Sequence, residues 1–375
     1  MGAIYIHIPF CKQACHYCDF HFSTSMGKKA EMILALQKEL QLRKGEFRDE
    51  VVETIYFGGG TPSLLSVDEL THIIRAVYTH YKVGENPEIT IEANPDDLSR
   101  DKIIGLGSSP VSRLSIGIQS FFDRDLKWMN RAHTGEEARK CLSVAREYFD
   151  NITIDLIYGI PGMDHKRWRE NLDMVLEYNI PHISAYALTV EPKTALDKFI
   201  RSGKAPAPDE THAGEQFTIL TDVLRHKGFV HYELSNFGKE GYFSRNNSSY
   251  WLGKKYLGIG PSAHSYDGRN RSWNVANNAI YLKSLNKGEL PQETEVLTTT
   301  DRYNEYIMTG LRTIWGVSLK RLEEDFGTGY YRYLLKETKK YLDNGLLDIR
   351  GEVLRTTVKG KFLTDGIASD LFYVD

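Results

Sequence analysis

Three of the four cysteines in the chain lie within eight residues, at Cys11, Cys15 and Cys18. Thiolates at this spacing can bind three corners of an iron–sulfur cube from one loop, which leaves the fourth iron without a protein ligand. An open iron offers a site to a substrate, so the pattern indicates chemistry rather than electron storage alone. The alternative is structural zinc, with His16 or His21 as the fourth ligand. Zinc loops usually belong to small modules that fold around the metal, whereas this loop follows the first predicted strand of a long chain.

Other polar or small residues stand at or just past the ends of predicted strands. They are residues 58–61, Glu92, Gln119 and Thr189. In parallel α/β proteins ligands bind at that edge of the sheet, so we expect these residues to form a site. Asp155 lies inside an apolar strand, where an ionised carboxylate needs a partner. The fourth cysteine, Cys141, lies in a predicted helix and is expected to be a buried apolar residue rather than a ligand.

The elements that must position these residues follow from a hydrophobic pattern that switches between strand and helix periods. Predicted strands cover residues 3–8, 54–57, 89–91, 114–118, 152–157 and 183–188. Predicted helices cover residues 28–44, a segment from Ser66, a segment from Thr134, and about 166–178 and 209–227. Ser66 with Glu69 and Thr134 with Glu137 have the spacing of capping boxes, which predicts where the second and third of these helices begin. Alternating strands and helices imply right-handed crossovers and a parallel sheet, hence the α/β class. The period of the hydrophobic pattern is compatible with both an open doubly wound sheet and a partial barrel.

The last part of the chain has a different pattern. After about residue 236 the alternation weakens, and the last 80 residues look mainly helical, with a hairpin-like segment at 346–354. We therefore expect one domain of residues 1–235 and a smaller, mainly helical domain of residues 236–375.

Composition limits the classes of function. The 375 residues are 41% hydrophobic and 26% charged, and the formal net charge of −3 gives no basic field for binding nucleic acid. No stretch approaches the roughly 18 apolar residues of a membrane span, and the N-terminus lacks the basic region of a signal peptide. Three clustered cysteines are also unlike a secreted disulfide framework. We expect a cytoplasmic protein that binds no nucleic acid and has no integral membrane span.

Five further motifs accompany the C-x3-C-x2-C loop along the chain. They are Tyr5-Ile-His-Ile-Pro-Phe-Cys11, Phe57-Gly-Gly-Gly-Thr-Pro62, Gly117-Ile-Gln-Ser120, Asp155-Leu-Ile-Tyr-Gly-Ile-Pro161 and Leu257-Gly-Ile-Gly-Pro-Ser-Ala-His264. In this order they resemble the oxygen-independent coproporphyrinogen III oxidase-like family of the radical S-adenosylmethionine (SAM) superfamily. The resemblance covers essentially the whole chain, including residues 354–360. It implies a partial (β/α)6 TIM-like radical SAM barrel followed by a smaller, mainly helical, winged-helix-like domain.

The resemblance also implies cofactors. A 4Fe–4S cluster would be bound by Cys11, Cys15 and Cys18, and its open iron would bind the amino and carboxylate groups of SAM. One electron from a donor protein then splits SAM into methionine and a 5′-deoxyadenosyl radical. The residues that match SAM-contacting positions are Tyr5, Gly59, Gly60, Thr61, Glu92, Gln119, Arg131, Asp155 and Thr189. A glycine run lets the backbone approach a ligand closely, and it also permits a tight strand-to-helix turn; both explanations can hold.

Three departures from the oxidase separate two functions. Phe20 stands where the oxidase has a further cysteine, and the oxidase's extension before the first strand has no counterpart before residue 3. Both departures favour the haem-chaperone branch, HemW, which would bind haem and pass it to respiratory apoproteins. The alternative is an enzyme that decarboxylates coproporphyrinogen III oxidatively in porphyrin biosynthesis. The third departure is Asn246, which replaces the histidine of a haem-binding motif, and His264 is our candidate for a substitute ligand; the alternative for His264 is a structural role.

Overall fold

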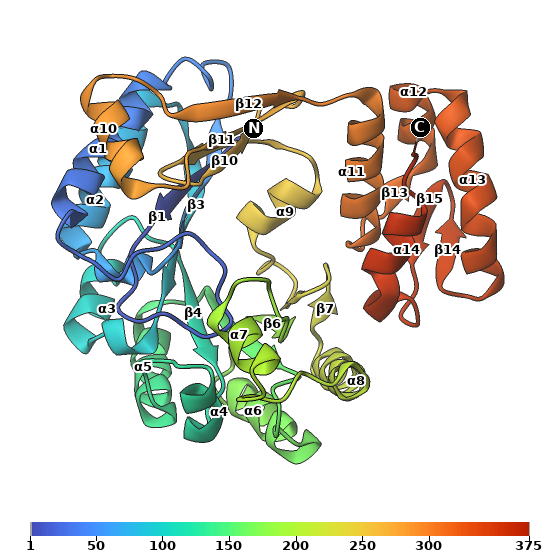
Figure 1. The fold of residues 1–375 in the computed structure, drawn as a ribbon, viewed down its shortest axis with the longest axis horizontal. Coiled ribbons are helices and arrows are strands. Elements are labelled where there is room, and N and C mark those ends of the chain that lie inside the picture. The colour runs from blue at the N-terminus through green and yellow to red at the C-terminus, as the bar shows by residue number, and fades with distance from the viewer. Residues whose placement is uncertain (1, 375) are drawn as a thin grey trace.

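The computed structural model describes residues 2–374 and shows a large α/β part beside a smaller, mainly helical part (Figure 1). The strands of the large part are β1 (Gly2–Ile8), β2 (Val52–Gly59), β3 (Val83–Ala93), β4 (Arg113–Gln119), β5 (Ile152–Tyr158), β6 (His182–Ala187), β7 (Val230–His231), β8 (Asn236–Gly238), β9 (Lys255–Ile259), β10 (His264–Tyr266), β11 (Asn270–Asn274) and β12 (Gln292–Val296). Its helices are α1 (Lys29–Leu42), α2 (Val67–His80), α3 (Arg100–Gly107), α4 (Asp123–Trp128), α5 (Gly135–Tyr148), α6 (His165–Glu177), α7 (Ala195–Arg201), α8 (Glu210–His226), α9 (Arg245–Trp251) and α10 (Asn278–Asn286), with short 3-10 turns η1 (Pro62–Leu64) and η2 (Pro95–Asp97).

The strands form one twelve-stranded sheet in the order β12-β11-β10-β9-β1-β2-β3-β4-β5-β6-β8-β7. From β1 to β6 each strand pairs in parallel with the next along the chain, and β9 adds a parallel strand on the other side of β1. The strands beyond β9 and β6 are antiparallel. Within residues 2–374 the sheet runs from β12 to β7 without closing, which confirms the predicted partial (β/α)6 barrel.

Side-chain alternation places the core of the large part. Ile4, Ile6 and Ile8 of β1 are at most 1% exposed, and they belong to the same apolar cluster as the buried face of α1. The capping boxes predicted at Ser66 and Thr134 are both present and begin α2 and α5. No helix among the described residues is both long enough and apolar enough to cross a lipid bilayer.

The parallel strands all end at one edge of the sheet. There β1 leads into the cysteine loop, β2 into the glycine run, and β3, β4 and β5 into the segments after Ala93, Gln119 and Tyr158. This geometry brings residues that are far apart in sequence close together.

The smaller part has a core of its own, built from residues between Tyr303 and Leu371. Its elements are α11 (Thr299–Leu311), β13 (Val317–Ser318), α12 (Leu319–Phe326), α13 (Thr328–Asp343), β14 (Leu347–Arg350), β15 (Val353–Thr356), η3 (Lys361–Leu363) and α14 (Thr364–Asp370). The predicted hairpin is β14–β15, and β13 completes a small antiparallel sheet, as in a winged-helix-like domain.

The sequence places the domain boundary between residues 235 and 236, but the large sheet continues across that position. Strands β8 to β12 extend it to Val296, and Leu282 and Leu285 of α10 belong to the core of the large part. The second core begins at Tyr303. We therefore propose a division at residues 297–298.

Candidate iron–sulfur and SAM site

The cysteine loop is closed at its base by backbone hydrogen bonds. The amide of Cys11 donates to the Ser23 carbonyl over 3.0 Å, and the Ser23 amide donates to the Pro9 carbonyl over 3.0 Å. Inside the loop, the Cys18 amide donates to the Cys15 carbonyl over 3.3 Å. The three cysteines are free and half-buried. One compact loop therefore presents all three sulfurs, as the spacing predicts.

Two side chains from outside the loop donate hydrogen bonds to these sulfurs. Thr61 Oγ1, which follows β2, donates to Cys11 Sγ over 3.4 Å, and Arg131 Nη1 donates to Cys15 Sγ over 3.4 Å. Asn94 links the two donors, because its Nδ2 donates to Thr61 Oγ1 over 3.3 Å and its Oδ1 accepts from Arg131 Nη2 over 2.6 Å. Asn94 is absent from the sequence prediction, although its place directly after β3 is the same signal that identifies Glu92.

Burial and neighbouring charges shift the pKa of several side chains in and beside the cysteine loop. Burial raises the pKa of the Cys11 thiol and raises that of Cys18 to about 11. Burial alone would lower the pKa of Arg131, but Tyr17 and Cys15 beside it raise that pKa above its usual range. Iron binding must displace the thiol protons, so loading of this loop is favoured by rising pH.

Zinc would take its fourth ligand from either His16 or His21, and each of these histidines has one ring nitrogen in a hydrogen bond. His16 Nδ1 lies 3.0 Å from the Trp128 carbonyl, and His21 Nε2 lies 2.8 Å from Asn278 Oδ1. Among residues 2–374, the cysteine sulfurs and these histidines do not form a group whose ligand atoms all lie within 4.8 Å of one another. The ligand atoms of a tetrahedral zinc ion with bonds of about 2.0–2.3 Å lie closer together than 4.8 Å, so these side chains as they stand do not form a zinc site.

Two half-buried carboxyl groups, Glu92 of β3 and Asp155 of β5, lie on the strands either side of β4. Tyr56 donates to Glu92 Oε1 over 2.7 Å, and burial, reinforced by Asp155, raises the pKa of Glu92 to about 7. Burial also raises the pKa of Asp155 to about 6, although hydrogen bonds from Ser184 and Ser115 favour its ionised form. Asp155 therefore has the polar partners that its apolar strand demands, and Tyr56 is a further residue that the sequence prediction lacks.

The glycine run is required by its own protein neighbours. Gly59 has a φ of +104°, and a Cβ there would collide with the His7 ring. A Cβ on Gly60 would lie 2.5 Å from the Phe10 carbonyl oxygen, at the base of the cysteine loop. The Thr61 amide donates to that same oxygen over 2.6 Å. The tight-turn explanation therefore holds for these glycines, and contact with a ligand remains a prediction.

Two buried polar atoms at the edge of the sheet have no hydrogen-bond partner: Gln119 Oε1 and Arg131 Nε. Gln119 adopts a φ of +62°, and a Cβ on Gly117 would lie 2.9 Å from its amide nitrogen. An unpaired buried polar group costs free energy, so these atoms fit a bound polar ligand. Together with the three cysteines, they are compatible with the predicted 4Fe–4S cluster and SAM.

Most of the predicted residues therefore meet at one edge. Glu92 and Asp155 interact with each other, and Asp155 with Arg131, which reaches the cysteine loop. Tyr5 adjoins this group, since its ring stacks on Tyr56 with centroids 6.1 Å apart. Thr189 is the exception, because it is exposed just past β6 and no hydrogen bond joins its side chain to the group among the described residues. The SAM-contacting roles stay predictions.

Position 246 lies inside the barrel rather than on its surface. Asn246 of α9 is 1% exposed. Its side-chain Oδ1 accepts a hydrogen bond from Thr54 Oγ1 over 2.9 Å, and its backbone amide donates to Glu88 Oε1 over 3.1 Å. His264 is exposed on β10, and its ring centroid lies 5.9 Å from that of Trp273.

Comparison with known families and proteins agrees with this geometry. A model of the radical SAM superfamily matches residues 5–175, and a model of the HemN C-terminal domain matches residues 297–363. The chain is 33% identical over 367 residues to the heme chaperone HemW of Bacillus subtilis, covering 97% of each protein. It is 33% identical over 377 residues to the heme chaperone HemW of Lactococcus lactis, covering 98% of each.

Among solved structures, the chain is similar to the coproporphyrinogen III oxidase HemN of Escherichia coli. The TM-score is 0.85, with 22% sequence identity, over 99% of this chain and 90% of that one. At that identity the likeness concerns the fold, and it includes both the partial barrel and the C-terminal part.

Proposed function

Because this chain belongs to the radical SAM superfamily, and within it to the oxidase-like family that contains the HemW heme chaperones, we propose that it binds haem and delivers it to respiratory apoproteins. The observation that carries the proposal is the match to curated chaperones over nearly the full length of both chains. Membership of the radical SAM superfamily implies that a 4Fe–4S cluster and SAM bind at the site described above. When bound, they supply a one-electron route to a carbon radical.

The residues of the site have separate tasks. The three cysteines bind the cluster, while Thr61 and Arg131 hydrogen-bond two of the sulfurs and so stabilise their negative charge. Gln119 Oε1 is free to accept a hydrogen bond from SAM, and Arg131 Nε is free to donate one. Glu92 and Asp155 offer carboxylate acceptors deeper in the barrel.

Haem requires a ligand other than residue 246. The Asn246 amide is committed to Thr54 inside the barrel and offers no imidazole. The geometry of β10 and β11 supports His264 instead. His264 pairs directly with Trp273, and Tyr266 lies two residues along the same face, paired with Tyr256. An exposed imidazole among aromatic rings is suited to ligate iron and to pack against a flat porphyrin.

Phe20 argues against the oxidase alternative. At the place where the oxidase has a further cysteine, the Phe20 side chain is 66% exposed beside the cluster loop. It offers no ligand and no redox group. This substitution supports the chaperone and does not supply the oxidase's chemistry.

The test is a haem titration of the anaerobically reconstituted protein, followed by absorption in the Soret region. Wild type is expected to bind haem with an axial histidine, and His264→Ala is expected to lose that ligand. His226→Ala, which removes an exposed histidine from α8, is the matched control and should behave as wild type. Absence of saturable haem binding by wild type would contradict the chaperone proposal, whereas an unchanged spectrum of His264→Ala would reject only this ligand.

A further inference from the structure

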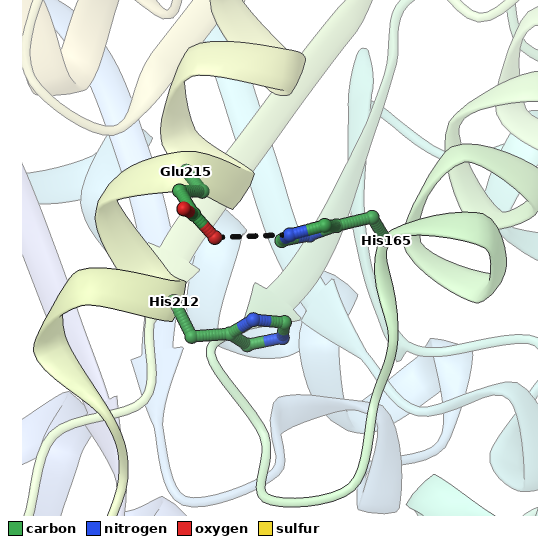
Figure 2. A group of neighbouring side chains, drawn as sticks. All are labelled: His165, His212 and Glu215. Carbon is green, nitrogen blue, oxygen red and sulfur yellow. Dashed lines mark hydrogen bonds and ion pairs between the residues drawn. The ribbon is translucent and has the colours of Figure 1, made fainter.

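A cluster of three metal-binding side chains lies outside the site described above (Figure 2). His165 is the first residue of α6, and His212 and Glu215 lie three residues apart on one face of α8. One ligand atom from each residue can be chosen so that all three lie within 4.8 Å of one another. Figure 2 shows the His165 ring above the His212 ring, with the Glu215 carboxylate directed at His165. We propose that these three residues bind one divalent transition-metal ion of the zinc type.

The hydrogen bonds of His212 leave one nitrogen for a metal. His212 Nε2 lies 2.7 Å from the Met163 carbonyl oxygen, which can only accept, and 3.0 Å from Gln216 Nε2, which itself donates to that oxygen over 3.1 Å. Both nitrogens share this one acceptor, and we assign the proton of His212 to Nε2 because its contact with the oxygen is the shorter. His212 Nδ1 therefore has the free lone pair. Histidines that ligate metals characteristically donate their other ring N–H to a backbone carbonyl or a carboxylate, because that bond fixes the tautomer and the ring orientation. His212 already has this arrangement.

His165 and Glu215 supply the other two ligands. His165 Nε2 lies 3.0 Å from Glu215 Oε2, close to the separation of about 3.3 Å between two ligands of a tetrahedral ion with bonds of about 2.0–2.1 Å. A metal ion can take the place of the proton that these two atoms share. Two imidazoles and one carboxylate are a ligand set that zinc uses, with water at the fourth position.

One rearrangement is needed. The two imidazole rings are stacked, with centroids 4.5 Å apart and an angle of 21° between their planes, whereas a bound ion lies in the plane of each ligating ring. The His165 ring must turn about its Cβ–Cγ bond. No second hydrogen bond resists that turn, since His165 Nδ1 is buried without a partner.

The surrounding charges affect how tightly the metal ion binds. The N-terminal turns of α6 and α8 carry partial positive charge, which disfavours a cation nearby. The negative charges of Glu215 and of Asp164 and Asp209, which cap these two helices, offset that effect. The ion would join α6 to α8 at the start of α6, which follows the loop after β5. The site thus fastens two outer helices of the barrel and stands apart from the cluster loop.

The experiment uses full-length protein with its cluster reconstituted under anaerobic conditions, so that the cysteine loop is occupied and cannot take the probe. Zn²⁺ is titrated in competition with a chromophoric chelator, and Co²⁺ is added separately to read the ligand type from its visible spectrum. We expect one Zn²⁺ per chain beyond the cluster, and a Co²⁺ spectrum of nitrogen and oxygen ligation without thiolate bands.

The variants separate binding from folding. His165→Ala and Glu215→Gln should each weaken Zn²⁺ binding by at least about tenfold. His226→Ala, an exposed histidine at the end of the same helix α8, should leave the affinity unchanged. An unaltered cluster spectrum shows that each variant is folded, and Glu215→Gln alters a mostly exposed side chain. The proposal is overturned if wild type binds no additional ion, or if His165→Ala and Glu215→Gln bind Zn²⁺ as wild type does.

Discussion

Replacing Glu92 by glutamine should stabilise the cluster-free protein against unfolding at pH 8 but not near pH 4.5. Glutamine has nearly the shape of glutamate, and its Oε1 can accept the hydrogen bond that Tyr56 donates to Glu92 over 2.7 Å. What the substitution removes is the ability to ionise. In the folded protein ionisation is penalised by burial and by the neighbouring Asp155, and together these raise the pKa of Glu92 to about 7.

The magnitude follows from that pKa. Because the folded protein binds this proton more tightly than the unfolded chain does, stability is greatest below the unfolded pKa of 4.5 and falls as the pH rises to about 7. A difference of about 2.5 pKa units corresponds to about 3 kcal/mol, at 1.36 kcal/mol per unit. Above that range the loss is constant. Glu92→Gln cannot ionise and so does not lose this stability. The variant should match wild type near pH 4.5 and exceed its free energy of unfolding at pH 8 by about 2–3 kcal/mol.

The assay is urea unfolding of both proteins at these two pH values, followed by circular dichroism. Glu85→Gln is the control, because Glu85 is an exposed residue of the same strand β3, and its replacement should leave the difference in stability between the two pH values as in wild type. Asp155 remains in both proteins and leaves a residual pH dependence. The reasoning is refuted if Glu92→Gln has the same effect at both pH values, or if wild type is the more stable protein at pH 8.

Three further predictions concern the cluster. Anaerobic protein should contain about four irons per chain, and alanine at any of the three clustered cysteines should abolish the cluster by iron and sulfide analysis, while Cys141→Ala retains it; stoichiometric zinc in place of iron would refute this. Arg131→Leu removes a hydrogen bond and a cation from the Cys15 sulfur, so the midpoint potential in an EPR-monitored titration should fall by on the order of tens of millivolts, and an unchanged potential would exclude the contact. Gly60→Ala places a Cβ 2.5 Å from the Phe10 carbonyl oxygen, so it should destabilise the fold by about 1–3 kcal/mol in urea unfolding and lower iron content; wild-type values for both would show that the loop tolerates the side chain.

Local sequence signals predicted the first six strands and the helices α1, α2, α5, α6 and α8, but not the shorter helices α3 and α4. The alternation of Ile4, Ile6 and Ile8 and the capping boxes at Ser66 and Thr134 are each contained in a few residues, and all of them are present in the structure. The convergence of Glu92 and Asp155 was also predictable, because parallel neighbouring strands bring their ends to one edge.

Longer-range features carried no such local signal. Strand β12 has five exposed residues and no apolar alternation, so the sequence did not extend the sheet to Val296. Asn94 is significant only through its bonds to Thr61 and Arg131, which pattern reasoning cannot see. The burial of Asn246 depends on α9 packing inside the barrel.

The most direct test of the account is a product assay with coproporphyrinogen III under strict anaerobiosis. The cluster-loaded protein is incubated with SAM and a reductant, and porphyrinogens are separated by chromatography, with a known oxidase as the positive control. Hydrogen abstraction requires the substrate to be held within a fraction of an ångström of its reactive position, and misplacement by about 1 Å can cost on the order of a hundredfold in rate. The account predicts that no protoporphyrinogen IX forms while haem still binds to the same preparation. Measurable turnover to protoporphyrinogen IX would contradict the assignment as a haem chaperone.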